Sequence, residues 1–183
     1  MKVSIIVAMT ADGYIGRTSD HLATTWTNEE DKYLFTHYVK EAGNMVMGLN
    51  TFKTTARKFP GVFNKSMPGR RLLVYTPDPE EVAPYANVEA VSEPPEALVA
   101  RLEKEGVKHL AICGGTTIYT IFLQAGLVQD IYVDMQATLF GAGMPFLNQA
   151  IEAEIELKEI KRLGDNNVLL HYKVQHKQTE HGR

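Results

Sequence analysis

The sequence is poor in cysteine and in long apolar runs, and its charge is nearly balanced. Cys113 is the only cysteine among 183 residues, so the chain cannot form an internal disulfide. No apolar stretch approaches the roughly 20 residues that a helix needs to cross a bilayer. The net charge of −3, without a basic run or a patch that interleaves basic and aromatic residues, argues against nucleic acid as a partner. We therefore expect neither a disulfide-stabilised secreted domain nor a membrane or nucleic-acid-binding protein.

Length and composition predict one globular domain. A chain of 183 residues with 44% hydrophobic content is long enough to bury a substantial core. We expect residues 1–174 to form this domain and the polar residues 175–183 to form a disordered tail. The N-terminus enters a strand-like run directly, without a secretory signal pattern, so we expect the protein to be cytoplasmic.

Strand-like and helix-like segments alternate along the chain. Apolar or alternating runs predict strands at residues 3–9, 44–47, 71–75, 109–113, 131–136, 154–162 and 167–174. Capping residues and amphipathic spacing predict helices that begin at residue 28 and near residues 50–51, and helices over residues 94–105 and 117–124. Residues 56–67 predict a surface loop. This order indicates an α/β fold with a mostly parallel sheet and an antiparallel hairpin at its C-terminal edge.

Asp31 is a charged residue on the apolar face of an expected helix. Thr27 and Glu30 predict a capping box, with the helix starting at Asn28. The i, i+3, i+4, i+7 spacing then places Asp31 on one face with Leu34, Phe35 and Tyr38. A buried carboxylate needs a hydrogen-bonding partner, which points to a ligand. The alternative is a solvated first-turn acid that stabilises the helix dipole.

Two glycine positions follow predicted strands and precede predicted helices. Gly114 and Gly115 come after one strand, and Gly48 comes after another. A backbone without side chains lets a ligand approach closely, and the following helix N-terminus offers free N–H groups to a pyrophosphate. The alternative is a tight turn with no ligand, because the full G-x-G-x-x-G pattern is absent. If both strands are parallel, these ends lie at the same edge of the sheet, where open α/β folds bind ligands.

An ordered set of motifs resembles the dihydrofolate reductase-like superfamily, which also includes the reductase domain of riboflavin biosynthesis. The matching segments span most of the chain: residues 3–9 with Asp12 and Ile15-Gly16, Trp26 with Asp31 and Phe35, Val46-Met47-Gly48 with Thr51-Phe52, Pro68-Gly69-Arg70, and Gly114-Gly115 with Tyr119. The resemblance implies a three-layer fold with a mostly parallel central sheet. It implies no metal and a small-molecule substrate.

The resemblance implies that Asp31 is the catalytic acid of a dihydrofolate reductase. It would bind the amino-pyrimidine edge of the pterin and promote protonation of N5 while a hydride arrives at C6, giving tetrahydrofolate. The same comparison places Ile6, Val7, Phe35 and Cys113 in the pterin pocket, although such residues are more commonly plain core. Arg70 would clamp the folate carboxylate, or it is an exposed turn residue.

The cofactor implied by the resemblance is NADPH, with NADH possible. The residues at matching positions are Ala8, Ile15, Gly16, Gly48, Asn50, Thr51, Tyr75, Thr76, Cys113, Gly114, Gly115, Thr116, Thr117, Ile118 and Tyr119. The places where the family commonly carries basic residues for the 2′-phosphate hold Leu49, Pro77 and Thr117. We expect a reduced preference for NADPH unless another cation substitutes, and the nearby ones are Lys53, Arg57 and Lys58.

Two features point to the riboflavin-pathway relatives instead. Asp134 occupies a place where dihydrofolate reductases usually carry a threonine, and residues 139–145 resemble the glycine-rich ending of the riboflavin-type reductase domain. If Asp134 faces Asp31, the two carboxyl groups would share a proton; otherwise Asp134 is a solvated acid at a strand end. The alternatives to a dihydrofolate reductase are therefore a reductase of a phosphoribosylated diaminopyrimidine and a non-catalytic nucleotide-binding module. The protein is expected to be a monomer or a homodimer.

Overall fold

The computed structural model describes residues 1–63 and 71–175, and every predicted strand is present in them. The strands are β1 Lys2–Thr10, β2 Tyr14–Gly16, β3 Asn44–Gly48, β4 Arg71–Tyr75, β5 Val88–Val91, β6 His109–Ile112, β7 Asp130–Gln136, β8 Met144–Pro145, β9 Glu154–Arg162 and β10 Asn167–Gln175. The helices are α1 Glu29–Ala42, α2 Leu49–Lys58, α3 Pro95–Lys104 and α4 Thr116–Gln124, with short 3₁₀ turns η1 Ala23–Thr25 and η2 Pro79–Glu81. Arg70 and the tail expected after Gln175 lie outside the described residues.

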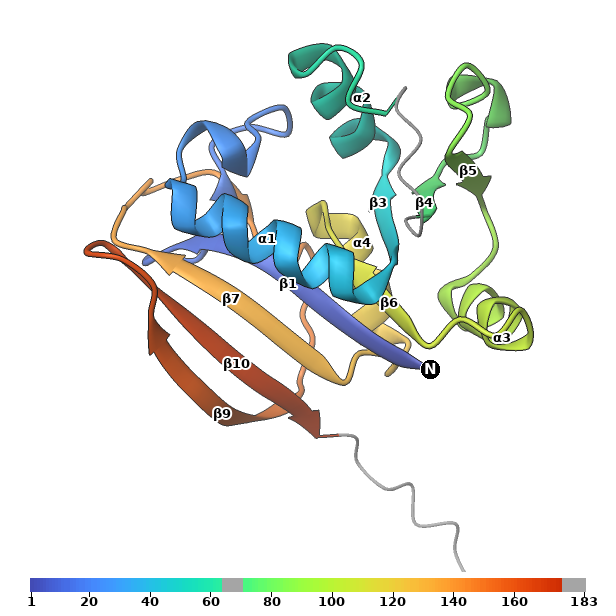
Figure 1. Cartoon of the computed structure of the whole chain (residues 1–183). Helices are drawn as coiled ribbons and strands as arrows, with labels where there is room; N and C mark the ends of the chain where they lie inside the picture. Colours follow the sequence, from blue (N-terminus) through green and yellow to red (C-terminus); the bar gives the residue numbers. More distant parts are fainter. Residues whose placement is uncertain (64–70, 176–183) are drawn as a thin grey trace, which may run out of the picture.

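Eight strands form one sheet in the order β5-β4-β3-β6-β1-β7-β10-β9 (Figure 1). The central strand β1 pairs in parallel with β6 and β7, and Ile5 aligns with Ile112 on one side and Ile131 on the other. At the far edge β10 runs antiparallel to both β7 and β9. The prediction of a mostly parallel sheet with an antiparallel C-terminal hairpin is confirmed.

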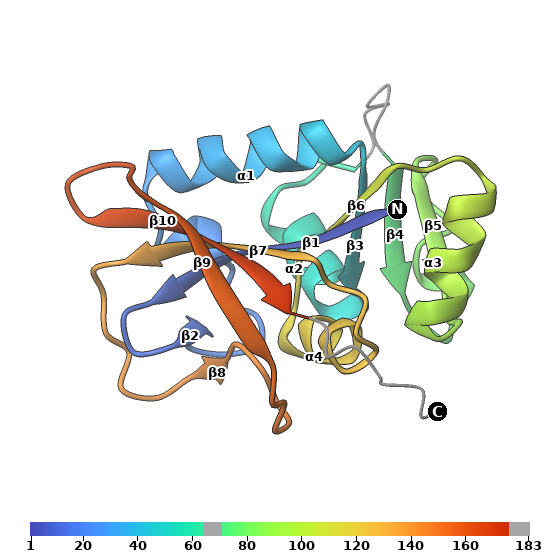
Figure 2. The ribbon, with the colours of Figure 1, turned by 90° about the horizontal axis from the view of Figure 1, so that it is seen from below.

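Helices cover both faces of this sheet, as the alternating pattern of its strands requires. Figure 2 shows α1 on one side of the strands and α4 on the other. Ile5 of β1 packs with Phe122 of α4, whereas the neighbouring Ile6 packs with Val39 of α1. Successive strand residues point to opposite faces, so each face buries its own set of apolar side chains. The three-layer arrangement is confirmed.

The start of α1 differs by one residue from the predicted capping box. Asn28 is the N-cap: its backbone is extended, and its side-chain oxygen accepts a hydrogen bond from the Asp31 N–H at 3.1 Å. The Thr27 hydroxyl instead donates to the Ala23 carbonyl oxygen at 2.9 Å, which closes the preceding 3₁₀ turn. The prediction of a Thr27 cap was therefore wrong, because a local hydrogen bond to the preceding η1 turn engages that hydroxyl.

Two further local predictions need correction. Helix α2 begins at Leu49, directly after Gly48, so neither Asn50 nor Thr51 caps it. The short strands β2, β5 and β8 were not predicted from the sequence. These strands have two to four residues, too few for a periodic pattern. β2 and β8 pair with each other, and β5 pairs with β4.

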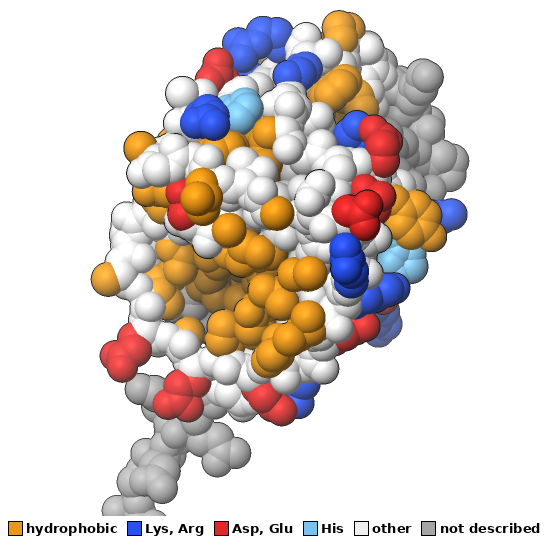
Figure 3. Space-filling model, turned by 90° about the vertical axis from the view of Figure 1, so that its left-hand side faces the viewer, with side chains coloured by type: hydrophobic (Ala, Val, Ile, Leu, Met, Phe, Trp, Pro, Cys, Tyr) orange, Lys and Arg blue, Asp and Glu red, His pale blue; other side chains and the backbone are white. Residues whose placement is uncertain are grey.

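The outer face of the C-terminal hairpin is apolar and open to solvent. A bulge opposite the His171–Tyr172 step makes Lys158 an extra residue, so Leu157 aligns with Tyr172 and Ile160 aligns with Leu170. The bulge keeps Ile160 on the same face as Leu157 despite their odd spacing, and their exposed fractions are 64% and 48%. Figure 3 shows apolar side chains gathered on the side of the molecule that carries β9 and β10 in Figure 1.

Candidate functional site

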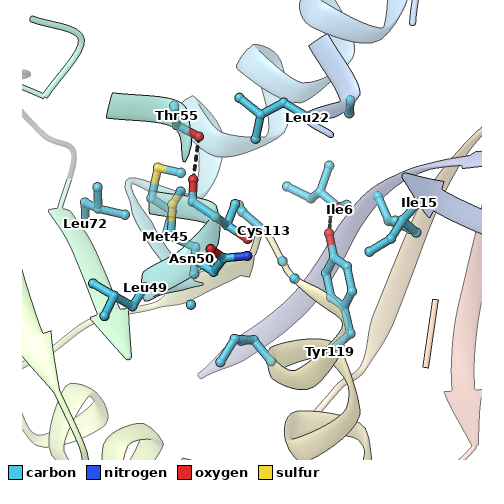
Figure 4. Close-up of a pocket in the computed structure, with 18 of the residues that line it drawn as sticks. Ile6, Ile15, Leu22, Met45, Leu49, Asn50, Thr55, Leu72, Cys113 and Tyr119 are labelled. Atoms are coloured by element: carbon cyan, nitrogen blue, oxygen red, sulfur yellow. Dashed lines mark hydrogen bonds between the residues drawn. The ribbon is translucent and has the colours of Figure 1, made fainter. Parts of the chain in front are cut away.

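One large cavity of about 890 Å³ opens where the central parallel strands end. It is bounded by the ends of β1, β3, β4 and β6 and by α1, α2 and α4 (Figure 4). All the sequence-predicted site residues that the structure describes line this cavity: Ile6, Val7, Ala8, Ile15, Gly16, Asp31, Phe35, Gly48, Asn50, Thr51, Tyr75, Thr76, Cys113, Gly114, Gly115, Thr116, Thr117, Ile118 and Tyr119. Their individual roles remain predictions. Within the described part of the chain, no group of three or more metal-ligating side chains comes together.

Two helix N-termini meet at one end of the cavity. Helix α2 starts after Gly48 and helix α4 starts after Gly115, and neither N-cap supplies a side-chain hydrogen bond. The first N–H groups of each helix have no intrahelical acceptor and carry the positive end of the helix dipole. This end of the cavity therefore suits an anionic group such as a pyrophosphate.

The glycine pair leaves room for a ligand to lie against the backbone. Gly114 has φ = +109° and is joined to Gly115 by a cis peptide bond. A Cβ on Gly114 would lie 3.2 Å from the Tyr119 hydroxyl, and a Cβ on Gly115 would lie 3.3 Å from the Thr51 hydroxyl. A side chain at either position would fill the space beside the glycine backbone, which we call the glycine cradle. The residues present therefore fit a dinucleotide cofactor.

The cofactor end of the cavity has little positive charge. Leu49, Pro77 and Thr117 line this end. They are the uncharged residues at the positions where the family commonly carries basic residues for the 2′-phosphate. Two of the cations considered as substitutes are paired with acids: Lys53 lies 2.7 Å from Glu81, and Arg57 lies 3.7 Å from Asp20. These acids offset the charge that a 2′-phosphate would need.

Asp31 lies on the apolar face of α1 and reaches the cavity. Its exposed fraction is 7%, so the interpretation as a solvated helix-dipole acid is wrong. Burial raises the pKa of this carboxyl, while the nearby Thr27 side chain acts in the opposite direction. Phe35 lies one turn further along and also lines the cavity. The buried carboxyl of Asp31 is therefore placed to contact a ligand bound in the cavity.

Asp134 faces Asp31 rather than the solvent. Its exposed fraction is 1%, and its carboxyl hydrogen-bonds with that of Asp31. Burial and the nearby Asp31 charge raise the pKa of Asp134 to about 7. The structure thus excludes the solvated strand end and brings the two carboxyl groups together.

Three amide side chains around the acid pair were missed by the sequence analysis. Gln136 and Asn167 donate hydrogen bonds to Asp134, and both also reach the side-chain oxygen of Asn28. They come from the end of β7, the start of β10 and the cap of α1. No local pattern could have joined them, because only the pairing of Asn167 with Gln136 across β10 and β7 brings them together.

Tyr119 fixes the floor of the cavity between α4 and β1. Its hydroxyl donates to the Ile6 carbonyl oxygen at 3.0 Å, and the side chain is buried (Figure 4). Burial raises its pKa well above the ordinary value, as burial does for the Cys113 thiol. Both groups therefore stay neutral and contribute shape rather than charge.

The sheet order and the cavity at its strand ends define a protein of the dihydrofolate reductase-like fold. The family model of the RibD C-terminal domain matches residues 1–169, and the chain belongs to this family. No curated protein matches the sequence significantly.

Solved structures with similar folds include riboflavin-biosynthesis proteins and a dihydrofolate reductase. A putative riboflavin biosynthesis protein from Shewanella sp. PV-4 is 19% identical, with a TM-score of 0.76 over 96% of this chain and 100% of that one. Dihydrofolate reductase from Enterococcus faecalis, solved with NADP(H), is 18% identical, with a TM-score of 0.67 over 96% and 97%. RibD from Acinetobacter baumannii is 19% identical, with a TM-score of 0.74 over 96% of this chain and 58% of that one. RibD-like reductases and dihydrofolate reductases use NADPH.

The described helices include none that is both long and apolar enough to span a membrane.

Proposed function

We propose that the protein is an NADPH-dependent reductase of the riboflavin-pathway type, which reduces a phosphoribosylated aminopyrimidine. The observation that carries the proposal is that two uncapped helix N-termini and the buried carboxyl of Asp31, backed by Asp134, lie at one cavity. The first suits a dinucleotide and the second suits a nitrogen heterocycle that must take up a proton. Family membership favours the pyrimidine substrate over dihydrofolate, which the sequence alone had favoured.

Each part of the reduction has a group suited to it. NADPH, when bound, supplies the hydride. Asp31 would hold the N–H edge of the pyrimidine through its carboxyl oxygens, and as the acid it would protonate the nitrogen next to the reduced carbon. Lys32 also lines the cavity, next to Asp31, and is the cation that we assign to the substrate phosphate. Lys32 is paired with the exposed Glu29, and a surface ion pair of this kind contributes little free energy, so Lys32 can leave Glu29 to bind a phosphate.

The experiment is a comparison of two substrates with one enzyme. Cofactor oxidation is followed with 5-amino-6-(5-phosphoribosylamino)uracil, the substrate printed in the name of a similar Thermotoga maritima enzyme, and with dihydrofolate. We expect turnover with the former, and a Lys32→Met variant should raise its KM without changing the Kd of NADPH. Turnover with dihydrofolate alone would reject the proposal.

Dihydrofolate reduction is the second candidate, because Asp31 and Phe35 line the cavity one helical turn apart. This spacing matches the predicted contacts to a pterin edge and ring. Methotrexate offers a direct test, because binding that depends on Asp31, measured with Asp31→Asn, would favour a pterin site. Weak binding that is the same in both proteins would favour the pyrimidine substrate.

A further inference from the structure

Asp134 lies behind Asp31, between strands and away from the cavity wall. In β7 it pairs with Ala8 of β1 on one side and Leu169 of β10 on the other. Asp31 lines the cavity, whereas Asp134 is not part of that lining. A substrate can therefore contact Asp31 directly but can reach Asp134 only through it.

Amide donors surround the Asp134 carboxyl. Gln136 Nε2 lies 2.8 Å from Oδ2, and Asn167 Nδ2 lies 3.0 Å from Oδ1 and 3.2 Å from Oδ2. Since amide N–H groups only donate, neither of these two contacts can accept a proton held by Asp134. The Asp31 carboxyl is the partner that can accept it.

Few other charges act on the pair. Lys32 and Glu30 lie beside Asp31 on α1, and Tyr119 of α4 faces it with a hydroxyl that stays neutral. The neighbours from β1 and β10 are uncharged, namely Ala8, Leu169 and Asn167. Burial is the largest influence on both carboxyl groups and favours their protonated forms. The protonation of each carboxyl is thus set mainly by burial and by the other carboxyl.

We propose that Asp31 and Asp134 work as one acid that holds a single shared proton, with Asp31 as the member that delivers it and Asp134 as the positioning residue that retains it. This inference rests on the proposed reductase function for its chemical use. Asp134 touches no substrate; it acts through Asp31.

The proton and electron balance of the step is simple. NADPH, when bound, would supply a hydride to the carbon of the C=N bond in the ring-opened imine form of the ribosylamino group, and the π electrons of that bond would move to nitrogen. The nitrogen takes the proton from the pair through Asp31, giving CH–NH. Two carboxylates remain, and their mutual repulsion favours reloading of one proton from solvent.

The first experiment needs no substrate. Infrared difference spectra of the free protein across the pH range monitor the carbonyl stretch of a protonated carboxylic acid. We expect a band that titrates near neutral pH in the native protein and is absent there in both Asp31→Asn and Asp134→Asn. Asp130→Asn is the matched control, because it removes another buried carboxyl of β7 that pairs with His171 and Lys173 instead. A neutral-pH band that persists in Asp134→Asn would overturn the proposal.

The second experiment uses the pH profile of single-turnover hydride transfer. In Asp134→Asn, the pH midpoint at which the rate is lost should fall by at least about one pH unit. At a pH above the midpoints of both proteins, the variant should then be about tenfold slower than the native protein. Gln136→Leu should move it upward, because the ionised pair loses a hydrogen-bond donor. General structural damage would not produce opposite shifts.

Failure of this inference is distinguishable from failure of the proposed function. If no tested substrate turns over but the infrared band behaves as expected, the proposed reductase function is wrong and the proposal of a shared proton stands. If turnover is present and both variants keep the native pH profile, the pair is wrong and the function stands. Where Asp134→Asn does not fold, Gln136→Leu provides the same test through the direction of its shift.

Discussion

The backbone N–H of Gly48 donates a hydrogen bond to the carbonyl oxygen of Gly114, with an N···O distance of 2.9 Å. This bond joins the end of β3 to the end of β6, at the point where α2 and α4 begin. Two helix dipoles therefore converge on one end of the cavity. An anionic bridge between two nucleosides would meet free N–H groups from both helices.

Gly114→Ala should weaken cofactor binding by about tenfold or more. The residue has φ = +109°, and the added Cβ would meet the Tyr119 hydroxyl at 3.2 Å, so the cradle must shift. Titration of NADPH by fluorescence or calorimetry measures the change in Kd.

Gly106→Ala is the control for backbone strain. This glycine has φ = +85° but nothing within 4 Å of the added Cβ. It should cost about 1 kcal/mol of stability and leave cofactor binding unchanged. Equal weakening of binding in both variants would show that the glycine cradle has no specific role.

Asp31→Asn should lower kcat by about 10²- to 10⁴-fold, because an amide cannot donate a proton as an acid does. The Kd of NADPH should stay the same, since the helix N-termini lie at the other part of the cavity. Steady-state kinetics and cofactor titration separate the two effects. Glu96→Gln, which removes an exposed first-turn acid from α3, controls for loss of a helix-dipole contact and should retain full activity. An Asp31→Asn enzyme within threefold of native kcat would exclude the acid role.

The catalytic efficiency with NADPH should exceed that with NADH by less than a hundredfold, or about 2.7 kcal/mol. Leu49, Pro77 and Thr117 supply no charge for the 2′-phosphate, and Lys53 and Arg57 pair with acids. The measurement is kcat/KM with each cofactor at one saturating substrate concentration. Thr117→Arg should increase the ratio by placing a guanidinium beside the phosphate position. A native ratio far above a hundred would mean that another residue binds the phosphate.

Stability should depend on pH through Asp134. The pKa of this carboxyl is raised from 3.8 to about 7 in the folded protein, so between these values the folded state binds more protons than the unfolded state. The contribution is present in full below about pH 4 and is lost as the pH rises through about 7. Relative to Asp134→Asn, the free energy of unfolding of the native protein should fall by up to about 4 kcal/mol across this interval. Urea denaturation at a series of pH values measures the difference, and parallel curves for the two proteins would contradict the raised pKa.

Much of the fold could be predicted from the sequence because its signals are local. Residues 154–162 and 71–75 match β9 and β4 to the residue, since alternating or continuous apolar runs are a local signal of strand conformation. The ordered motifs also placed Asp31, Gly48 at the end of β3 and the two glycines after β6 together, and all of them line one cavity. The short strands β2, β5 and β8 could not be predicted, because each has too few residues for a periodic pattern and depends on pairing with another segment.

The sequence by itself determined the alternation of strands and helices, the family resemblance and the presence of an unusual acid at position 31. It left Asp134 with two alternatives, a solvated strand end or a partner of Asp31. Only the tertiary structure decided between them, because the parallel pairing of β7 with β1 buries Asp134 under α1, and the pairing with β10 brings Asn167 against it. Protonation depends on burial and on neighbours from other elements, and these are properties of the assembled sheet rather than of any segment of the chain.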